Sequence, residues 1–308
     1  MIYTVTLNPA VDYVVALDTL KLGAINRSSS EAVVFGGKGI NVSLMLRALE
    51  TPNIALGFIA GFTGDAIRDG LEAQGVHTDF VALDKGFTRI NVKLHAGEET
   101  EINGNGPEIP AEKLEYFVDK LRALSDADTL VLSGSVPSSL PADIYARIAR
   151  IAAEKGARLV VDAAGTLLLS TLPYKPYLIK PNRQELSELF GEPADTDEAV
   201  LALVKRLQAQ GAHHVLVSMA GDGALLCTQD GAVYRISAAE GTVVNSVGAG
   251  DSMVGGFLAA LEKTGDFAAA LALGAAAGGA TAFSVGIAGF QHVMAIYENL
   301  KTEVKRIG

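Results

Sequence analysis

Strand-like and helix-like segments alternate along this chain, and this alternation restricts its fold more than any other feature. The strand-like segments are short and rich in β-branched residues, and they comprise Ile2–Leu7, Ile54–Ala60, Thr129–Ser133, Leu159–Asp162, Tyr177–Lys180 and Val215–Met219. Helical periods lie between them, for example over Leu114–Leu124 and over Thr196–Gln210, which Gly211 follows. The pattern predicts an α/β fold whose mostly parallel central sheet is flanked by helices on both faces.

Polar side chains end several of the strand-like segments. Asp162, Lys180 and Ser218 each stand at or next to the end of such a segment. Ligands of open parallel sheets bind beyond the carboxyl ends of the strands. We therefore expect a ligand site at that edge of the sheet.

Two segments, at about 12–34 and 88–103, interrupt the alternation. Both are typical of antiparallel strands joined by polar turns, and we expect them to form one small sheet that covers the site. In Thr88–Leu94 a period of two places Arg89, Asn91 and Lys93 on one face. The opposite face carries only apolar residues, namely Ile90, Val92 and Leu94. This pattern suits a polar face toward a ligand and an apolar face toward a partner, although an ordinary half-exposed hairpin would show it too.

The composition excludes several classes of protein. A length of 308 residues suits one large α/β domain over residues 1–308, or a domain with a small appendage. The net charge of −10 argues against a nucleic-acid-binding surface, which requires basic patches. The single cysteine, Cys227, lies in an apolar run, so it favours a reducing cytoplasm and the role of a small buried side chain.

One apolar segment could be mistaken for a membrane span. Residues 267–297 contain no Asp, Glu, Lys or Arg. However, Ala and Gly dominate the segment, and a break is expected at Ser284–Gly286. The segment also lacks the flanking Lys and Arg residues that mark the cytoplasmic end of a membrane span. We expect a buried helix here, no membrane association, and no signal peptide at the N-terminus.

A glycine-rich stretch from Asn245 to Phe257 carries the strongest functional signal. A helix that begins near Gly250 would direct unpaired backbone N–H groups out of its first turn, which makes a seat for phosphate. Asp251 would lie at the rim of this seat, where a bound phosphate would repel its negative charge. A carboxylate at this position suggests a catalytic role, such as accepting the proton of a hydroxyl that attacks the phosphate. The alternative is a plain glycine-rich turn in which Asp251 caps the helix.

A second glycine-rich stretch, Gly36–Val42, opens an apolar helical period. It has neither the P-loop spacing nor the spacing of a dinucleotide-binding loop. Together the two stretches resemble the two signatures of the ribokinase-like sugar kinases of the phosphofructokinase B type. Three further segments, Thr4–Asp12, Thr88–Leu94 and Lys180–Leu186, are similar to the branch of that family that phosphorylates fructose 1-phosphate. The resemblance covers the whole chain.

The resemblance implies an activity and an architecture. The expected reaction is ATP-dependent and Mg²⁺-dependent transfer of a phosphoryl group to the C6 hydroxyl of D-fructose 1-phosphate. The expected architecture is a ribokinase-like α/β body with a β lid, which is often clasped between the two subunits of a homodimer. Asp251 is then the general base, and the amides of Gly248, Ala249, Gly250 and Asp251 form the anion hole.

The family motifs also suggest residues that bind the sugar phosphate. Asp12 would accept hydroxyls of the sugar, while Gly37 and Asn41 would approach it from the second stretch. Lys38 and Arg89 are cations that could both reach the phosphate already carried by the substrate. The complete expected set is Asp12, Gly37, Lys38, Asn41, Arg89, Asn91 and Asn103.

A further set of residues is expected at Mg-ATP. The nucleotide set is Lys180, Asn182, Ser218, Gly221, Gly223, Ser246, Gly248 and Gly250. Asn182 and Glu185 share a helix face and would hold Mg²⁺ through water, although Glu185 could equally complete a capping box. The glycines after Ser218 would pass under the nucleotide, although this segment is also compatible with a hairpin turn.

Other functions remain open at this point. Related kinases act on tagatose 6-phosphate or fructose 6-phosphate, and a regulator could keep the fold without catalysis. A pure binder has no need of a base beside an anion seat, and a dehydrogenase would need the missing dinucleotide loop. The five histidines have no metal-ligand spacing, and we assign them no role.

Overall fold

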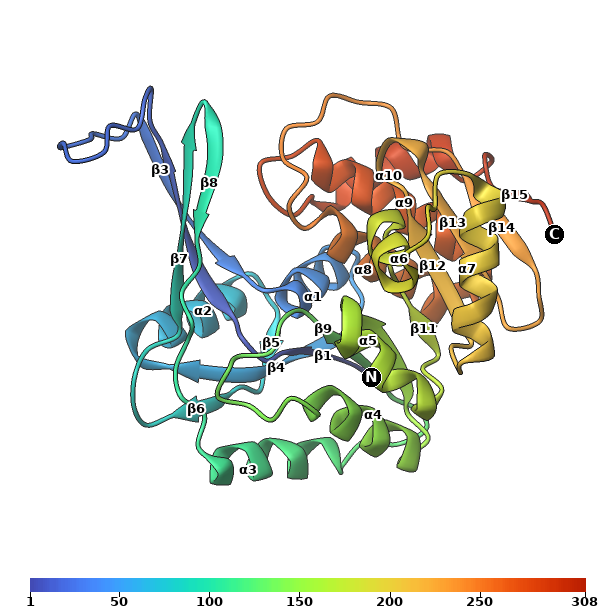
Figure 1. Ribbon diagram of the computed structural model, residues 1–308, viewed down its shortest axis with the longest axis horizontal. Coiled ribbons are helices and arrows are strands. Elements are labelled where there is room, and N and C mark those ends of the chain that lie inside the picture. The colour runs from blue at the N-terminus through green and yellow to red at the C-terminus, as the bar shows by residue number, and fades with distance from the viewer.

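Two sheets of different size make up the molecule (Figure 1). The computed structural model describes the backbone of residues 1–308 and every side chain except that of Glu98. The larger sheet has the strand order β15-β14-β13-β12-β11-β10-β9-β1-β4-β5, with β6 paired to β4. Its strands from β12 through β5 are parallel, as is β6, and β13, β14 and β15 extend it in antiparallel fashion.

The strands of the larger sheet follow the predicted segments closely. Their bounds are β1 Ile2–Thr6, β4 Asn53–Ala60, β5 His77–Thr78, β6 Val81–Leu83, β9 Thr129–Ser133, β10 Arg158–Asp162, β11 Leu178–Ile179, β12 His214–Ser218, β13 Ala224–Cys227, β14 Val233–Ile236 and β15 Lys305–Arg306. All six predicted strands are therefore present. The sequence did not predict β5, β6, β14 or β15, which are short and lie toward the two ends of the sheet.

Helices cover both faces of this sheet, as the alternation predicted. One face carries α3 Ala111–Leu121, α4 Ile144–Glu154, α5 Gly165–Thr171, α6 Arg183–Phe190 and α7 Asp197–Ala209. The other face carries α1 Lys38–Ala48, α8 Ala249–Thr264, α9 Phe267–Ala282 and α10 Phe290–Leu300. Two short helical turns, η1 Leu172–Tyr174 and η2 Ala220–Asp222, complete the body. Each layer buries its own apolar core against the sheet.

Helix ends follow local chemistry. Thr196 Oγ1 accepts a 3.2 Å hydrogen bond from the amide of Ala199, which caps α7 where the sequence placed its start. Gly248 adopts a positive φ of 80° immediately before α8, and Gly265 adopts 67° immediately after it. These left-handed positions favour glycine because a Cβ atom is strained there. The glycines thus fix both ends of the helix that carries Asp251.

The charge-free segment 267–297 forms a buried helix followed by most of a helix that lies largely at the surface. It is divided into α9 and most of α10 by a turn that includes the predicted break at Ser284–Gly286. Most of α9 is buried, and Gly256 of α8 lies so close to α9 that a Cβ atom there would be 2.6 Å from the carbonyl of Leu273. In the described part of the chain, no helix has the length and apolar character needed to span a bilayer.

The smaller sheet rises from one end of the body as a lid (Figure 1). Its strand order is β3-β2-β7-β8, with bounds β2 Ala10–Ala16, β3 Ser30–Gly36, β7 Arg89–Ala96 and β8 Glu98–Ile102. The predicted hairpins β2–β3 and β7–β8 are antiparallel, but the two hairpins join through a parallel pairing of β2 with β7. Helix α2, Gly61–Ala73, packs under the base of the lid.

The two faces of the lid differ as the period of two predicted. Arg89, Asn91 and Lys93 line the cavity between lid and body. On the opposite face, Ile90 packs against the core beneath α2 of its own chain. The expectation that Ile90 is free for a partner is therefore wrong, because α2 covers the base of the sheet. Val92 and Leu94, farther along β7, are half-buried.

Candidate active site

A single open cavity of about 1940 Å³ lies between the lid and the carboxyl ends of the body strands. It brings together every residue that the sequence analysis assigned to sugar phosphate, nucleotide, metal or catalysis. These are Asp12, Gly37, Lys38, Asn41, Arg89, Asn91, Asn103, Lys180, Asn182, Glu185, Ser218, Gly221, Gly223, Ser246, Gly248, Ala249, Gly250 and Asp251. The cavity lies where the strand-ending polar residues predicted a ligand site.

Asp251 lies in the first turn of α8 and is only 6% exposed. Its Oδ2 accepts a 2.7 Å hydrogen bond from Nδ2 of Asn41, which lies in the first turn of α1. Burial, together with the negative charge of Asp162, raises the pKa of Asp251 to about 6, although the hydrogen bond from Asn41 opposes the shift. The carboxylate is therefore mostly ionised at neutral pH and close to the pKa suited to a general base.

The first turn of α8 also presents free donors. The amides of Ala249 and Ser252 bond to the carbonyls of Ser246 and Gly248. Within the described part of the molecule, the amides of Gly250 and Asp251 donate to no acceptor. Two such donors at a helix N-terminus suit an anion. The expected seat also included the amide of Ala249, but this amide is engaged by the carbonyl of Ser246.

A charged cluster borders this seat. Asp162, at the end of β10, is 1% exposed, and its Oδ1 contacts Nζ of Lys38 at 3.2 Å and Nζ of Lys180 at 3.4 Å. A Cβ atom at Gly250 would lie 3.3 Å from Nζ of Lys180, so this ammonium group stands beside the first turn of α8. Burial lowers the pKa of Lys38, but the carboxylates of Asp162, Asp251 and Glu185 outweigh burial and raise it overall.

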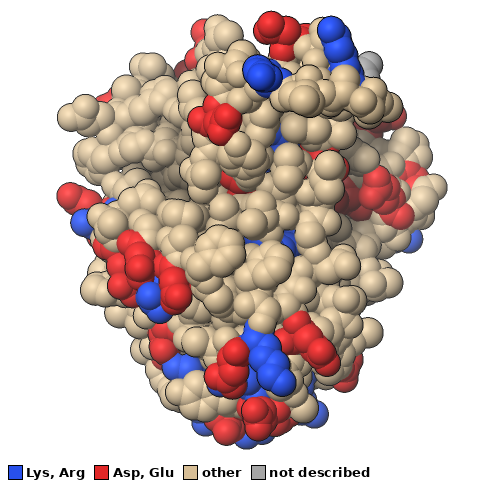
Figure 2. Space-filling view, turned by 90° about the vertical axis from the view of Figure 1, so that its left-hand side faces the viewer, with Lys and Arg blue, Asp and Glu red and all other residues tan. Residues whose placement is uncertain are grey.

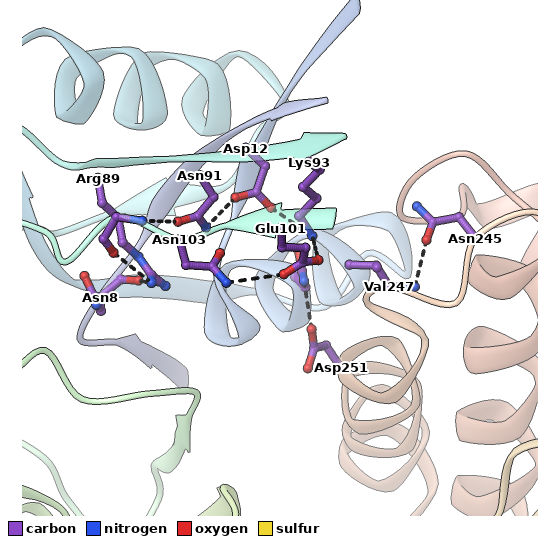
Figure 3. Close-up of polar contacts among 12 residues, drawn as sticks. Asn8, Asp12, Arg89, Asn91, Lys93, Glu101, Asn103, Asn245, Val247 and Asp251 are labelled. Carbon is purple, nitrogen blue, oxygen red and sulfur yellow. Dashed lines mark hydrogen bonds and ion pairs between the residues drawn. The ribbon is translucent and has the colours of Figure 1, made fainter. Parts of the chain in front are cut away.

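Arg89 lies elsewhere, at the base of the lid (Figure 3). Its Nη2 donates to the carbonyl of Asn8 at 2.9 Å, and its Nη1 donates to the carbonyl of Gly104 at 3.4 Å. Nε of Arg89 is buried and has no partner among the described residues. Lys38 is thus paired with Asp162 on the body, whereas Arg89 is anchored in the lid.

The lid presents a second polar network to the cavity (Figure 3). Asn91 donates a 2.8 Å hydrogen bond to Oδ1 of Asp12, and Nζ of Lys93 lies 3.5 Å from Oδ2 of the same carboxylate. Lys93 also contacts Glu101 at 3.2 Å, and Asn103 donates to Glu101 at 3.4 Å. These bonds fix the orientation of Asp12 toward the cavity.

Asn182 and Glu185 form a full capping box at the start of α6. The amide of Glu185 donates to Oδ1 of Asn182, and the amide of Asn182 donates to Oε2 of Glu185, both at 2.8 Å. The capping role that the sequence left open is therefore confirmed. One carboxylate oxygen of Glu185 is left by this motif, and oxygen is the ligand type that Mg²⁺ prefers. No group of three or more His, Cys, Asp or Glu side chains in the described structure could hold a metal ion directly.

The nucleotide side of the cavity has a glycine-rich floor and an apolar wall. Ser218 ends β12, and Ala220 and Gly223 adopt positive φ angles of 48° and 89° in the turn that follows. A Cβ atom at Gly221 would meet no atom within 4 Å, so the chain is open to a ligand there. Small and apolar side chains line the wall opposite, namely Ala238, Ala239, Ala275, Gly278, Gly279, Ala282 and Ile287.

Sequence reasoning missed several polar residues of the site. Asp162 was recognised only as a strand end, Lys93 was placed on the ligand side of its strand without a specific role, and Asn8 and Glu101 were given no role, although each lines the cavity. The alternation with Arg89 and Asn91 was a usable signal for Lys93. His95 also lines the cavity. Cys227 is buried, as expected, and burial raises the pKa of its thiol to about 11.

The family follows from comparison with known proteins. The model of the pfkB family carbohydrate kinases matches residues 5–291. The chain belongs to this family. A 1-phosphofructokinase of Bacillus subtilis is 49% identical over 284 residues, which are 92% of this chain and 93% of the relative. A D-tagatose-1-phosphate kinase of Bacillus licheniformis is 39% identical over 288 residues, 93% of this chain and 94% of the relative.

Solved structures confirm the fold expected of this family. Phosphofructokinase-2 of Escherichia coli, in complex with substrates and products, superposes with a TM-score of 0.90 at 26% identity and covers 97% of this chain and 99% of its own. Arabidopsis thaliana ribokinase, complexed with ribose and ATP, superposes with a TM-score of 0.82 at 22% identity and covers 96% and 98%. The pfkB-family chain therefore has the ribokinase-like α/β fold with a small lid sheet.

Proposed function

We propose that this pfkB-family kinase transfers the γ-phosphoryl group of ATP to the C6 hydroxyl of D-fructose 1-phosphate, which yields fructose 1,6-bisphosphate. One observation carries the proposal: a buried carboxylate, Asp251, stands beside free amides at a helix N-terminus and faces a cavity that Arg89 and other polar lid residues also line. The 49% identity with a 1-phosphofructokinase supports the choice of substrate.

The sugar phosphate is proposed to lie between Asp251 and the base of the lid. Asp12, held by Asn91, accepts hydrogen bonds from sugar hydroxyls. Asn41 and Gly37 approach the sugar from the start of α1. Arg89 binds the phosphate already on C1, because it lines the cavity and each Nη carries a second N–H beyond its bond to Asn8 or Gly104. Asn103 and Lys38 complete the substrate-binding set.

The nucleotide is proposed to enter along the glycine-rich floor. Ser218, Gly221, Gly223 and Ser246 line its path, and the apolar wall receives the base. Lys180, beside Gly250, reaches the transferring phosphate. Mg²⁺ bound to the nucleotide would neutralise phosphate charge, with Glu185 and Asn182 holding it through water.

The proton balance of the transfer follows from the position of Asp251. The C6 oxygen forms a bond to the γ-phosphorus while the bond from that phosphorus to the β,γ-bridging oxygen breaks and ADP departs. The hydroxyl proton passes to Asp251, which takes it late because an alcohol is far less acidic than a carboxylic acid. The amides of Gly250 and Asp251 and the ammonium of Lys180 stabilise the negative charge on the phosphoryl oxygens.

We further propose a cytoplasmic homodimer joined by the lids. A row of side chains crosses the outer lid face through the paired residues Val33, Tyr13, Val92 and Ile102. Val33 is 60% and Ile102 is 59% exposed. Figure 2 shows the side of the molecule that bears this face. A second copy would cover this exposed apolar row.

D-tagatose 1-phosphate is a second candidate substrate, because a kinase named for it is 39% identical over 93% of this chain. Tagatose and fructose differ in configuration at C4, which Asp12 could distinguish through its hydroxyl contacts. Neither the 6-phosphates nor a non-catalytic role has a comparable specific observation in its favour.

Steady-state assays with ATP and five acceptors test the proposal. The acceptors are fructose 1-phosphate, tagatose 1-phosphate, fructose 6-phosphate, tagatose 6-phosphate and free fructose. We expect fructose 1-phosphate to give the highest kcat/KM, with ³¹P spectra showing a new phosphate ester at C6. A preference for either 6-phosphate, or no turnover with fructose 1-phosphate, would overturn the assignment.

A further inference from the structure

Asp162 is the most deeply buried charged group of the cavity, and the proposed reaction gives it no part. It is 1% exposed and ends β10, the strand that pairs with β9 and β11 in the middle of the large sheet. One oxygen, Oδ1, contacts two ammonium groups, and the other, Oδ2, is buried without a partner among the described residues. A buried carboxylate that leaves one oxygen unpaired costs stability, so its retention requires an explanation.

The two ammonium groups come from different elements of the body. Lys38 opens α1, directly after Gly37, whereas Lys180 follows β11. Lys180 stands beside Gly250 in the anion seat. The negative charges of Asp162 and Asp251 both raise the pKa of Lys38. Because both ammonium groups contact the same oxygen, Asp162 holds two like charges near one point.

We propose that Asp162 is a positioning residue that holds the ammonium groups of Lys38 and Lys180 beside the N-terminus of α8, so that both bind the phosphoryl group in transfer. The inference rests on the proposed function and refines it. Lys38 then acts mainly on the transferred phosphoryl group, and Arg89 alone of the two cations holds the phosphate that the sugar already carries.

The geometry explains why an acid is needed at this position. Two ammonium groups repel each other, and without a shared anion each would turn toward solvent or toward a different carboxylate. Asp162 ends a central strand, so its carboxylate has little freedom to follow them. The lysines are thus arranged before ATP arrives, which avoids reorganisation during transfer.

Asp162 also acts on the base. The charged groups that face Asp251 are Asp162 from β10, Lys38 from α1 and Lys180 from the segment after β11. The negative charge of Asp162 favours the protonated form of Asp251. Removing that charge should therefore move the acidic limb of the kcat profile to lower pH, a change that a purely structural role would not produce.

The test compares Asp162→Asn with Asp197→Asn. Asp197 forms a 3.0 Å ion pair with Arg235 and is not among the residues that line the cavity, which makes it a matched control. For Asp162→Asn we expect kcat to fall about 10²-fold, the KM for the sugar phosphate to stay within about threefold, and the acidic limb to shift downward. Unchanged kcat, or a loss confined to KM for the sugar phosphate, would overturn the inference.

Lys38→Met provides an independent arm, which stands even if Asp162→Asn does not fold. We expect Lys38→Met to lower kcat, whereas Arg89→Ala should raise KM for the sugar phosphate. Calorimetry with ADP, aluminium fluoride and the sugar phosphate should show weakened binding of the transition-state mimic to Lys38→Met and unchanged binding of ADP alone. A rise in sugar-phosphate KM with intact kcat would return Lys38 to the substrate phosphate and refute the inference.

Failure of the proposed function gives a different result. The wild-type acceptor panel would then identify another sugar phosphate, and the kcat and KM comparison would be made with that acceptor. A wild type that turns over no acceptor refutes the proposed function alone, and calorimetry with ADP and aluminium fluoride then decides the inference by the same comparison of Lys38→Met with wild type.

Discussion

Asn41 donates a 2.7 Å hydrogen bond from its side-chain amide to Oδ2 of Asp251, across a sequence separation of 210 residues. This bond joins the first turns of α1 and α8, and so it connects the two glycine-rich stretches, which are far apart in the sequence. A hydrogen bond to an ionised carboxylate stabilises the charged form. Asn41 thus partly offsets the burial that raises the pKa of the base.

Asn41→Ala should make the base harder to ionise. Loss of the hydrogen bond raises the pKa of Asp251 above its value of about 6, so the acidic limb of kcat moves to higher pH. The measurement is kcat from pH 5 to 9, with Asn26→Ala in the exposed loop between β2 and β3 as a control. An acidic limb at the wild-type position would contradict the role of the bond. The shift is opposite in direction to that expected for Asp162→Asn.

Asp251→Asn should lower the turnover and raise the free energy of unfolding. Turnover should fall by about 10²–10⁴-fold, since the general base is lost. Folding raises the pKa of Asp251 from 3.8 to about 6, so the folded state gains stability from protonation at low pH. That contribution is lost as the pH rises through this interval, and above it the buried charge is a full penalty.

Removing the charge should therefore stabilise the chain at pH 8, by an amount on the order of 2 kcal/mol, and by about half as much at pH 5. Thermal unfolding of wild type and Asp251→Asn at both pH values measures this. A variant that is less stable than wild type at pH 8, or that keeps more than about a tenth of the activity, would contradict the assignment of Asp251.

Arg89→Ala should raise the KM for the sugar phosphate and leave the KM for ATP nearly unchanged. The loss of a charge-assisted contact costs about 1.5–3 kcal/mol, or one to two decades in kcat/KM. Arg89→Lys keeps the charge but not the forked guanidinium, so its KM for the sugar phosphate should lie between those of wild type and Arg89→Ala. Because Arg89 also bonds to the carbonyls of Asn8 and Gly104, a small loss of thermal stability should accompany the change. If Arg89→Ala keeps the wild-type KM for the sugar phosphate, the phosphate on C1 binds elsewhere.

Val33→Arg should dissociate the proposed dimer without unfolding the chain. The side chain is 60% exposed in the isolated chain, so substitution costs folding little, while a charge in the middle of a lid interface is strongly unfavourable. Light scattering at micromolar concentration should give a dimer for wild type and a monomer for the variant. Tyr116→Arg on α3, where the ring is 56% exposed, is the matched control. A monomeric wild type would refute the lid interface.

The sequence predicted the parts of the fold that depend on local pattern. Periods of 2 and 3.6 identified the central strands, α3 and α7, and the alternating face of β7. The parallel pairing of β2 with β7 was not predicted, because each hairpin is antiparallel by itself and nothing local to either specifies how they join. The cover that α2 places over Ile90 is likewise a tertiary contact between separate segments.

For the site, motifs placed residues in the cavity but did not pair them. Lys38 and Arg89 were both expected at one phosphate, yet the structure pairs Lys38 with Asp162, a residue 124 positions away. Glu185 illustrates a different limit. The same spacing of Asn182 and Glu185 satisfies a capping box and a water-mediated metal contact, so sequence alone could not choose, and the structure shows that the first is formed.

The register of β2 and β7 has a consequence for how products leave. It places Asp12 opposite Asn91 and Ala10 opposite Arg89, so the groups proposed to hold the hydroxyls and the C1 phosphate belong to one rigid ribbon. Asp251, Lys180 and the floor of the nucleotide path belong to the body. Under the proposed function, displacement of these two strands would remove both lid contacts from the sugar product in one movement and leave the apolar wall of the body in place. Under the proposed function, release of the sugar product would depend on the lid, whereas release of ADP would depend on the body, and either step could limit turnover.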